Sequence, residues 1–242
     1  MRVGLRVGAA FPAPPFNSMP GDTGLDIELM TELAAALGES IEFVAYEGAD
    51  FEGIFERLGD GEYDCVAAGT TVTSGRETLA EFLPPYLISG QALAVDTVRL
   101  PNVRSIEDLD GLTIGVQRGD TSESIAERLV AEGKAARLRV YDDGGLDAVM
   151  TDLTTGQCDA ALKLAPVLTE LAKAARRVSP GVQVVQHGLS VEHIAIAVAR
   201  ADQALAGRLR VAQAELESSG TLQRIRAKWL GNPYIDQSLA AL

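Results

Sequence analysis

The residues best suited to bind a small solute lie between Gly69 and Arg76, directly after a short apolar run from Cys65 to Ala68. The apolar run predicts a buried strand, and the sequence GTTVTSGR after it predicts a loop. In such a loop small residues leave backbone N–H groups accessible, hydroxyls are adjustable donors, and an arginine offers a planar charged fork. This combination favours a ligand that carries a carboxylate or a phosphate.

A second candidate site is the turn QRGDTS, which begins at Gln117 and leads from an expected strand into an expected helix. N–H groups and the positive end of the dipole at such a helix start attract anions. Asp120 followed by Glu123 also fits a capping arrangement, so an ordinary helix start is the alternative interpretation. This turn makes Gln117 a candidate to contact a ligand, and we expect Arg118 to face solvent.

Composition excludes several classes of protein. The chain has 242 residues, of which 47% are hydrophobic and 23% charged, and this suits one large or two small domains with a full core. The net charge of −13 opposes nucleic-acid binding and does not favour anionic membrane surfaces. An anion site in such a chain must concentrate positive charge locally. The longest apolar runs are shorter than the roughly 18 residues that a membrane span needs.

Enzymatic and metal chemistry find little support in the sequence. His187 and His193 are the only histidines, and we interpret both as structural. Cys65 and Cys158 each lie beside an aspartate at the start of an expected strand, and we expect buried thiols rather than a disulfide. The sequence contains no Ser-His-Asp order, metal-spaced cluster or GxGxxG motif. We therefore expect no cofactor.

The expected elements alternate between strand and helix, and the pattern starts again in the second half of the chain. We expect Asp26 to cap the first helix and Gly38 to end it. Right-handed crossovers between successive strands predict two similar α/β lobes with parallel sheets. Expected strands are residues 5–10, 41–47, 65–68, 92–96, 112–117, 137–142, 158–164, 182–188 and 194–200. Expected helices are residues 25–38, 50–64, 105–111, 121–132 and 146–156, with two more in 204–231 broken at Gly220.

Three segments together resemble the family 3 extracytoplasmic solute-binding proteins, the polar amino-acid receptors of ABC importers. AGTTVTSGRETLAEFLPPYLISGQ is similar to the family's AG-x-T-I-T-x-x-R segment with its later F-S-x-P-Y-x-x-S-G-Q. The first loop with the turn after it resembles the family's opening, and GTLQRIRAKWLG resembles its end. The resemblance implies a type II periplasmic-binding-protein fold, in which two α/β lobes joined by two hinge strands close over a ligand in the cleft between them. Lobe one would comprise residues 1–91 and 190–242, and lobe two residues 92–189.

The resemblance also assigns roles to individual residues. It implies that the N–H and hydroxyl of Thr71, a backbone group near Gly69 and the side chain of Arg76 hold the α-carboxylate of the ligand. A surface arginine in a polar loop is the alternative for Arg76. Phe51 would be an aromatic residue over the ligand or a simple core residue. In lobe two the resemblance favours Thr121.

Departures from the family pattern concern the ligand's amino group. The acid that usually binds this group aligns with Leu164, and a second acid of the first loop aligns with Ala10. Lys163 adds a cation that could face the cleft. A ligand ammonium between Lys163 and Arg76 without a carboxylate partner would suffer like-charge repulsion. We therefore expect an amine-free carboxylate or dicarboxylate to fit better than an α-amino acid, unless the alignment is shifted by one residue or Lys163 points into solvent.

Two further departures concern the ligand's lid and catalysis. The family's aromatic lid aligns with Ala13, and Phe11 or Phe16 could replace it. Cyclohexadienyl dehydratases share this fold and carry a catalytic glutamate on the helix after the lobe-two strand. Here that turn is APV at 165–167, which contains no acid.

These observations predict an extracytoplasmic solute-binding protein that captures a small amino acid or organic acid for an ABC importer. We expect a monomer in the periplasm or outside the cell, free or tethered to a membrane, with a permease as its partner. Met1 runs directly into an expected strand, so we expect that an export signal has been removed, the alternative being a cytosolic protein. The ligand-sensing domain of a receptor and a dehydratase-like enzyme are the alternative functions.

Overall fold

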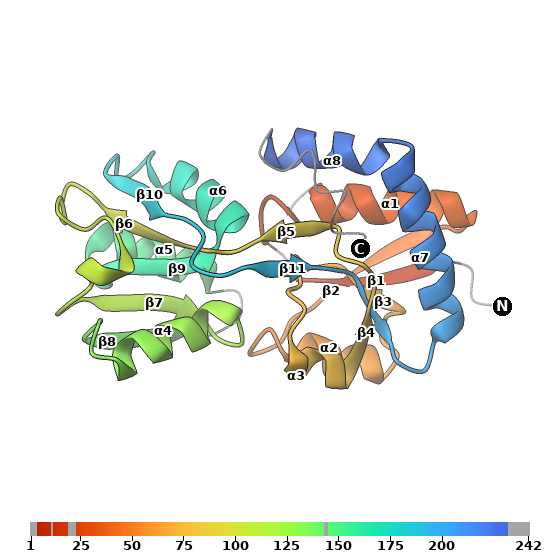
Figure 1. The fold of residues 1–242 in the computed structure, drawn as a ribbon, viewed down its shortest axis with the longest axis horizontal. Coiled ribbons are helices and arrows are strands. Elements are labelled where there is room, and N and C mark those ends of the chain that lie inside the picture. Colours follow the sequence, from red (N-terminus) through yellow and green to blue (C-terminus); the bar gives the residue numbers. More distant parts are fainter. Residues whose placement is uncertain (1–3, 11, 19–22, 143–144, 232–242) are drawn as a thin grey trace. The chain divides into compact units, whose positions relative to one another are not determined.

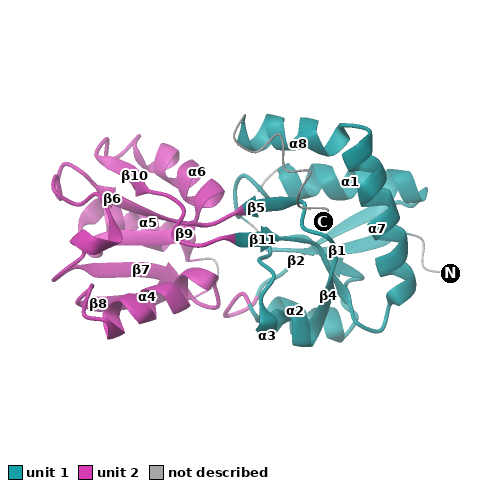
Figure 2. Cartoon of the chain, viewed as in Figure 1, with its two compact units in different colours: residues 1–47, 52–88, 192–242 teal, residues 48–51, 89–191 magenta. Residues whose placement is uncertain are grey.

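The computed structural model describes residues 4–10, 12–18, 23–142 and 145–231. They form two compact α/β units (Figure 1, Figure 2). Unit 1 comprises residues 1–47, 52–88 and 192–242, and unit 2 comprises residues 48–51 and 89–191. Apart from residues 48–51, the chain leaves unit 1 after residue 88 and returns at residue 192. The sequence predicts that lobe two begins after residue 91 and ends before residue 190, and these exact lobe boundaries stay a prediction.

Unit 1 is built on a five-stranded sheet in the order β2-β1-β3-β12-β4. Strand β1 pairs in parallel with β2 and β3, whereas β12 is antiparallel to both of its neighbours. A separate two-stranded sheet joins β5 and β11. The strands are β1 (Leu5–Ala9), β2 (Ile41–Ala45), β3 (Cys65–Val66), β4 (Ala80–Phe82), β5 (Leu87–Ser89), β11 (Glu192–Ile194) and β12 (Ala197–Ala199).

Five helices cover the sheet of unit 1. Helices α1, α7 and α8 pack together on one face, and α2 and α3 pack on the other (Figure 1). Gly220, with a φ of 79°, separates α7 from α8 as the sequence predicts. The helices are α1 (Leu25–Leu37), α2 (Gly53–Gly59), α3 (Ser74–Leu79), α7 (Gln203–Ser218) and α8 (Thr221–Leu230).

Helix α1 follows the expected stripe but not the expected cap. Leu29, Met30 and Leu33 are buried, and Gly38 ends the helix in the left-handed conformation. The N-cap residue is Gly24, and no side chain caps the helix. The prediction that Asp26 caps the start is wrong, because this side chain is fully buried and bonds to other parts of unit 1.

Unit 2 repeats the plan with a sheet in the order β10-β6-β9-β7-β8. Strand β7 is parallel to β8 and β9, whereas β6 is antiparallel to β9 and β10. The strands are β6 (Gln91–Asp96), β7 (Thr113–Gln117), β8 (Arg137–Tyr141), β9 (Ala160–Leu164) and β10 (Val182–Gln186). The helices are α4 (Thr121–Ala131), α5 (Leu146–Thr155), α6 (Ala165–Ala175) and the short 3-10 helix η1 (Ile106–Asp108).

Each face of the unit 2 sheet has its own core. On one face Met150 and Leu153 of α5 pack with Leu168 of α6. On the other face Ile125 and Leu129 of α4 pack against the sheet. The sheet is thus buried on both sides, which accounts for the apolar runs of its central strands.

The predicted parallel sheets are only partly correct. In each unit three strands are parallel, and the remaining two are antiparallel to their neighbours. The expected strand 194–200 corresponds to two short strands, β11 and β12. Four other elements were not predicted as separate elements from the sequence, namely α3, β4, β5 and α6. Short strands and the six-residue α3 contain too few residues for a period to be recognised, a reason that does not apply to the 11-residue α6.

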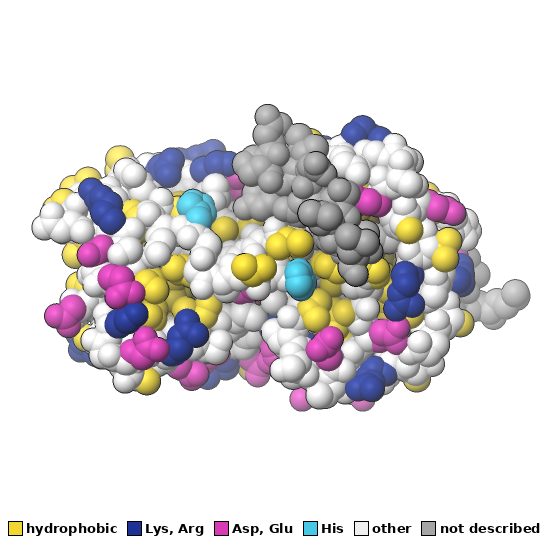
Figure 3. All heavy atoms as spheres, viewed as in Figure 1, with side chains coloured by type: hydrophobic (Ala, Val, Ile, Leu, Met, Phe, Trp, Pro, Cys, Tyr) yellow, Lys and Arg dark blue, Asp and Glu magenta, His cyan; other side chains and the backbone are white. Residues whose placement is uncertain are grey.

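Charged side chains of both signs lie on the face of the molecule that Figure 3 shows, where they are interspersed with no broad area of one sign. Within the described ranges no helix has the length and apolar character needed to span a bilayer.

Candidate functional site

The loop at residues 69–76 is held by a buried carboxylate of unit 1. Gly69 has a φ of 60°, and a Cβ at this position would lie 2.9 Å from the ring of Phe16, so the turn requires glycine. The Gly69 N–H donates to Asp26 Oδ2 at 2.7 Å, and the Tyr86 hydroxyl donates to Asp26 Oδ1 at 2.5 Å. Burial raises the pKa of Asp26 to about 6, an effect that these two hydrogen bonds partly offset. Asp26 therefore positions the start of the loop.

Arg76 lies in the first turn of α3, where the side chain of Thr73 caps the helix by accepting from the Arg76 N–H. Its Nε and Nη2 donate to Oε1 of Glu52 at 2.9 and 2.7 Å, and its Nη1 donates to the carbonyl of Thr71 at 3.0 Å. The guanidinium also lies 5.4 Å from the centre of the Phe55 ring. With only 3% of the side chain exposed, Arg76 is a buried cation, and the alternative of a surface arginine is wrong.

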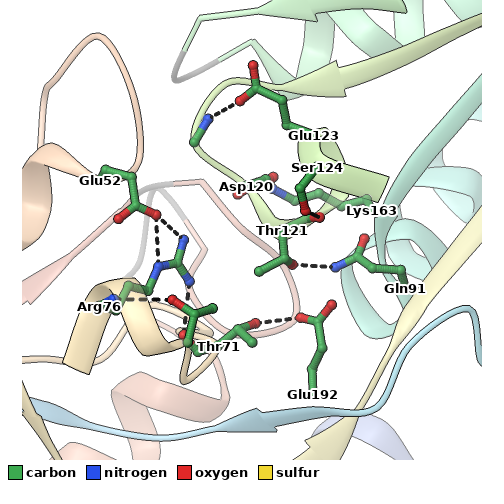
Figure 4. A network of polar contacts seen from close by, with 12 residues as sticks. Glu52, Thr71, Arg76, Gln91, Asp120, Thr121, Glu123, Ser124, Lys163 and Glu192 are labelled. Carbon is green, nitrogen blue, oxygen red and sulfur yellow. Dashed lines mark hydrogen bonds and ion pairs between the residues drawn. The ribbon is translucent and has the colours of Figure 1, made fainter. Parts of the chain in front are cut away.

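Thr71 is buried beside a second carboxylate of unit 1. Its hydroxyl donates to Oε2 of Glu192 at 2.5 Å, as Figure 4 shows. Backbone bonds hold this part of the loop against the segment that follows Glu192: Val72 N donates to His193 O at 2.8 Å, and Ala195 N donates to Thr70 O at 3.0 Å. A predicted carboxylate-binding residue thus lies next to an acid that the sequence analysis did not single out.

In unit 2, Lys163 has a carboxylate partner. Its Nζ forms an ion pair with Asp120 Oδ2 and donates to Gln117 Oε1 at 2.7 Å. The side chains of Lys163 and Asp120 are each 13% exposed. The expectation of a cation without a counter-charge is therefore wrong. Asp120 belongs to the α4 start and Lys163 to β9, and only the topology of the sheet brings them together.

The start of α4 combines a cap with a polar contact to β6. Glu123 accepts from the Gly119 N–H at 2.7 Å, so a capping interaction is present, although Asp120 itself makes no capping bond. Gln91 Nε2 donates to the Thr121 hydroxyl at 2.9 Å (Figure 4), and Gln91 is buried. Arg118 pairs with Asp142 and is about half exposed, as predicted.

Two of the three aromatic candidates, Phe51 and Phe16, lie within the described residues, and both are buried. Phe51 is 8% exposed, groups with unit 2, and donates its N–H to Arg118 O at 3.4 Å. Phe16 is fully buried against Gly69 and is a core residue, whereas Phe11 lies outside the described residues.

The two positions where the family pattern has an acid hold apolar side chains here, and both side chains are buried. Leu164 is 6% exposed and Ala10 is 9% exposed. The ligand-binding roles of the seven predicted residues stay a prediction. They are Phe51, Gly69, Thr71, Arg76, Gln117, Thr121 and Lys163.

Four residues that contact this predicted set were missed as site residues. Glu52, Glu192, Asp120 and Gln91 each form a hydrogen bond or an ion pair with one of its members. Asp120 was interpreted only as a cap, and its position beside an expected anion site was the one available signal. For the other three the sequence offers no local pattern, since their partners are 24 to 121 residues away.

Other chemistry finds no support in the part of the chain that the structure describes. No group of three His, Cys, Asp or Glu side chains there could hold a metal ion. Cys65 and Cys158 are buried thiols outside any disulfide, as predicted. Burial raises the pKa of Cys158 to about 11, which leaves little reactive thiolate at neutral pH.

Comparison with known proteins agrees with the resemblance found in the sequence. The profile of the bacterial extracellular solute-binding proteins, family 3, matches residues 5–232. The putative amino-acid ABC transporter-binding protein PatH of Vibrio harveyi is 27% identical over 94% of this chain and 88% of its own length.

Several solved structures share the fold at TM-scores above 0.8, and two of them are described here. An ancestral arginine-binding protein bound to arginine has a TM-score of 0.84 and 33% identity, covering 96% of this chain and 100% of the other. An ancestral amino acid-binding protein described as a precursor of cyclohexadienyl dehydratase has a TM-score of 0.82 and 29% identity, covering 93% and 95%. With the polar loop, the buried arginine and two α/β units in place, the chain belongs to the bacterial extracellular solute-binding proteins of family 3.

Proposed function

We propose that this protein is the extracytoplasmic receptor of an ABC importer and that it binds an α-amino acid. The observation that carries the proposal is the buried guanidinium of Arg76, held in the loop beside Thr71. A cation withdrawn from water binds a carboxylate more strongly than an exposed one, because its field is less screened. Arg76 and Thr71 would bind the α-carboxylate, and Gln117 and Thr121 of unit 2 would contact the same ligand.

The charge balance favours an amino acid over an amine-free acid. In unit 1, Arg76 faces the carboxylate of Glu52, and Thr71 adjoins the carboxylate of Glu192. In unit 2, Lys163 is matched by Asp120. In unit 1 these groups are one cation and two carboxylates, so a further carboxylate without an amine would add to a negative excess there. A zwitterion adds no net charge, and its ammonium group gains an attractive environment.

The relatives support the same class of ligand. The Vibrio harveyi relative is named an amino-acid ABC transporter-binding protein, and the ancestral structure is bound to arginine. From these relatives we infer only the class of ligand, an α-amino acid, for this chain. L-arginine is the first ligand to test. We further propose that the protein acts outside the cytoplasm as a monomer that delivers its ligand to a membrane permease.

We infer that the protein is a receptor and has no catalytic activity. Helix α6, which follows β9, begins with Ala165, Pro166 and Val167 and supplies no acid where the dehydratases of this fold carry one. An assay for cyclohexadienyl dehydratase activity should therefore give no turnover, and measurable turnover would reverse this inference.

A thermal-shift screen over the common L-amino acids and a set of organic acids tests the proposed function. A ligand that binds only the folded protein raises stability by RT ln(1 + [L]/Kd), so saturating L-arginine or another amino acid should raise the Tm. Calorimetry on each ligand that produces a shift should give a one-to-one complex. Binding of organic acids together with no response to any α-amino acid would contradict the proposal.

A further inference from the structure

We propose that Gln91 accepts a hydrogen bond from the α-ammonium group of the ligand and so helps to select amino acids against amine-free acids. This inference rests on the proposed function, because it assigns a recognition role within an amino-acid site. Gln91 is the first residue of β6 and is 2% exposed. Its Nε2 atom donates to the Thr121 hydroxyl at 2.9 Å, so one end of the carboxamide is bound to a predicted site residue.

The other end of this carboxamide, the Oε1 atom, is a buried acceptor. Within the part of the chain that the structure describes, Oε1 is out of solvent and accepts no hydrogen bond. In Figure 4 the carboxamide turns its nitrogen to Thr121 and its oxygen away from it. A buried acceptor without a donor costs free energy, and a carbonyl oxygen of this kind has two lone pairs to offer. An ammonium group carries three donors, so a ligand amine at this oxygen would satisfy it.

The cross-strand neighbour of Gln91 is the position where the family pattern has its amine-binding acid. Strands β6 and β9 are antiparallel, and their register sets Gln91 opposite Leu164. Side chains directly opposite one another in an antiparallel pair lie on the same face of the sheet, with Cβ atoms about 4.5 to 5.5 Å apart. Leu164 offers no acceptor, so the polar group beside the position of the missing acid is the carboxamide of Gln91.

Backbone contacts within unit 2 fix the place from which this side chain extends. The Gln91 N–H donates to Ser190 Oγ at 2.9 Å, and its carbonyl accepts from the Leu189 N–H at 3.0 Å. The carbonyl of Gly90 accepts from the Ala165 N–H at 2.9 Å. A Cβ on Gly90 would lie 2.0 Å from the carbonyl oxygen of Ser190, so this close approach requires glycine. Gln91 therefore has a defined position relative to β9 and to the segment that ends at Ser190.

The geometry of an α-amino acid agrees with this assignment. Its ammonium and its carboxylate are bonded to one carbon, so the protein groups that bind them must be neighbours. Thr121 is proposed to contact the ligand, and Gln91 is its hydrogen-bond partner. Two other acceptors of unit 2 near the predicted residues are less suitable, because Gln117 Oε1 and Asp120 both bind the ammonium of Lys163. A ligand ammonium there would compete with a resident cation.

The test compares Gln91→Met with the unaltered protein by calorimetry. Methionine keeps an unbranched side chain of similar length but has no carboxamide. The probes are L-arginine and δ-guanidinovaleric acid, which is arginine without its α-amino group, followed by the same pairing for any other amino acid that binds. We expect the Kd of the amino acid to rise at least about 10-fold more than that of the amine-free acid, because only the amino acid loses a hydrogen bond from a charged group. Loss of the contact with Thr121 alone would weaken both probes equally.

Two further variants keep the test decisive. Gln91→Glu has nearly the same shape and adds a negative charge at this position, so the preference for the amino acid over the amine-free acid should grow by about 10-fold or more. This variant decides the question if the Gln91→Met protein does not fold. Gln183→Met changes an exposed glutamine of β10 in the same unit and should leave both affinities unchanged.

Equal weakening of both probes by Gln91→Met, or a Gln91→Glu protein with no greater preference for the amino acid, would overturn the role of Gln91 while leaving the proposed function intact. An unaltered protein that binds no α-amino acid would instead refute the proposed function and this inference together.

Discussion

Replacing Arg76 by alanine should abolish tight ligand binding while leaving the protein folded. Loss of one partner of a buried, charge-assisted pair costs roughly 2 to 5 kcal/mol, which corresponds to about 30-fold to several thousand-fold in Kd. Arg76→Lys keeps the charge but loses the planar fork, so an intermediate loss is expected. Calorimetry with L-arginine, or with the best ligand of the screen, measures both effects.

The cost of Arg76→Ala to folding follows from the contacts that it removes. The bond to the carbonyl of Thr71 contributes about 1 kcal/mol, and the contact with the Phe55 ring contributes about 0.5 to 2 kcal/mol. The pair with Glu52 adds little, because this carboxylate is 46% exposed and water can solvate it after the change. A loss of about 1.5 to 3 kcal/mol leaves a domain of ordinary stability folded, as urea unfolding should confirm.

A matched control lies in the same unit. Arg57 also pairs with an acid, Glu62, and lies 5.2 Å from the centre of the Tyr46 ring, but its side chain is 40% exposed. Arg57→Ala removes the same charge and should leave the Kd unchanged. The reasoning would be refuted if Arg76→Ala bound ligand as well as the unaltered protein, or if Arg57→Ala lost binding to the same extent.

Three more predictions concern the charges of each unit and the response to ligand. Asp120→Asn and Lys163→Met should each lower the free energy of unfolding by about 2 to 3 kcal/mol, because each leaves one charge of the pair without its partner. The double variant should lose less than the sum of the two single losses. Strictly additive losses in urea unfolding would contradict a coupled pair. Asp26 has a folded pKa of about 6 against an ordinary 3.8, so the folded protein binds this proton more tightly than the unfolded chain does. Its contribution to stability should therefore be lost as the pH rises through about 6, and acidification from pH 7 to 4 should stabilise the unaltered protein relative to Asp26→Asn by about 2.4 kcal/mol. A difference in unfolding free energy that does not change with pH would count against the assignment. Saturating ligand should compact the protein in small-angle X-ray scattering, as expected for two lobes that close over a solute, and identical profiles would argue against closure.

The sequence by itself determined the class of fold and identified the candidate binding loop. Apolar periodicity located the long helices, such as α1 and α4, because one buried face repeats every three or four residues in any helix of this kind. Local composition identified the loop from Gly69 to Arg76, since its donors and its small residues are adjacent in the chain. The turn before α4 was recognisable for the same reason.

Only the tertiary structure decided which charges meet. Asp120 and Lys163 are 43 residues apart, and Thr71 and Glu192 are 121 residues apart, so no local pattern links them. Asp26 shows the same limit, because a carboxylate in a first helical turn fits a surface cap as well as a buried acceptor, and only Tyr86 and the Gly69 N–H distinguish the two. Patterns along a chain report which face of an element is apolar, whereas strand order and direction determine which polar groups lie opposite one another. The expected preference for an amine-free acid combined the missing acids at Leu164 and Ala10 with an isolated Lys163. The second ground is removed by the tertiary structure, since the pairing of β7 with β9 brings the α4 start, with Asp120, to that lysine.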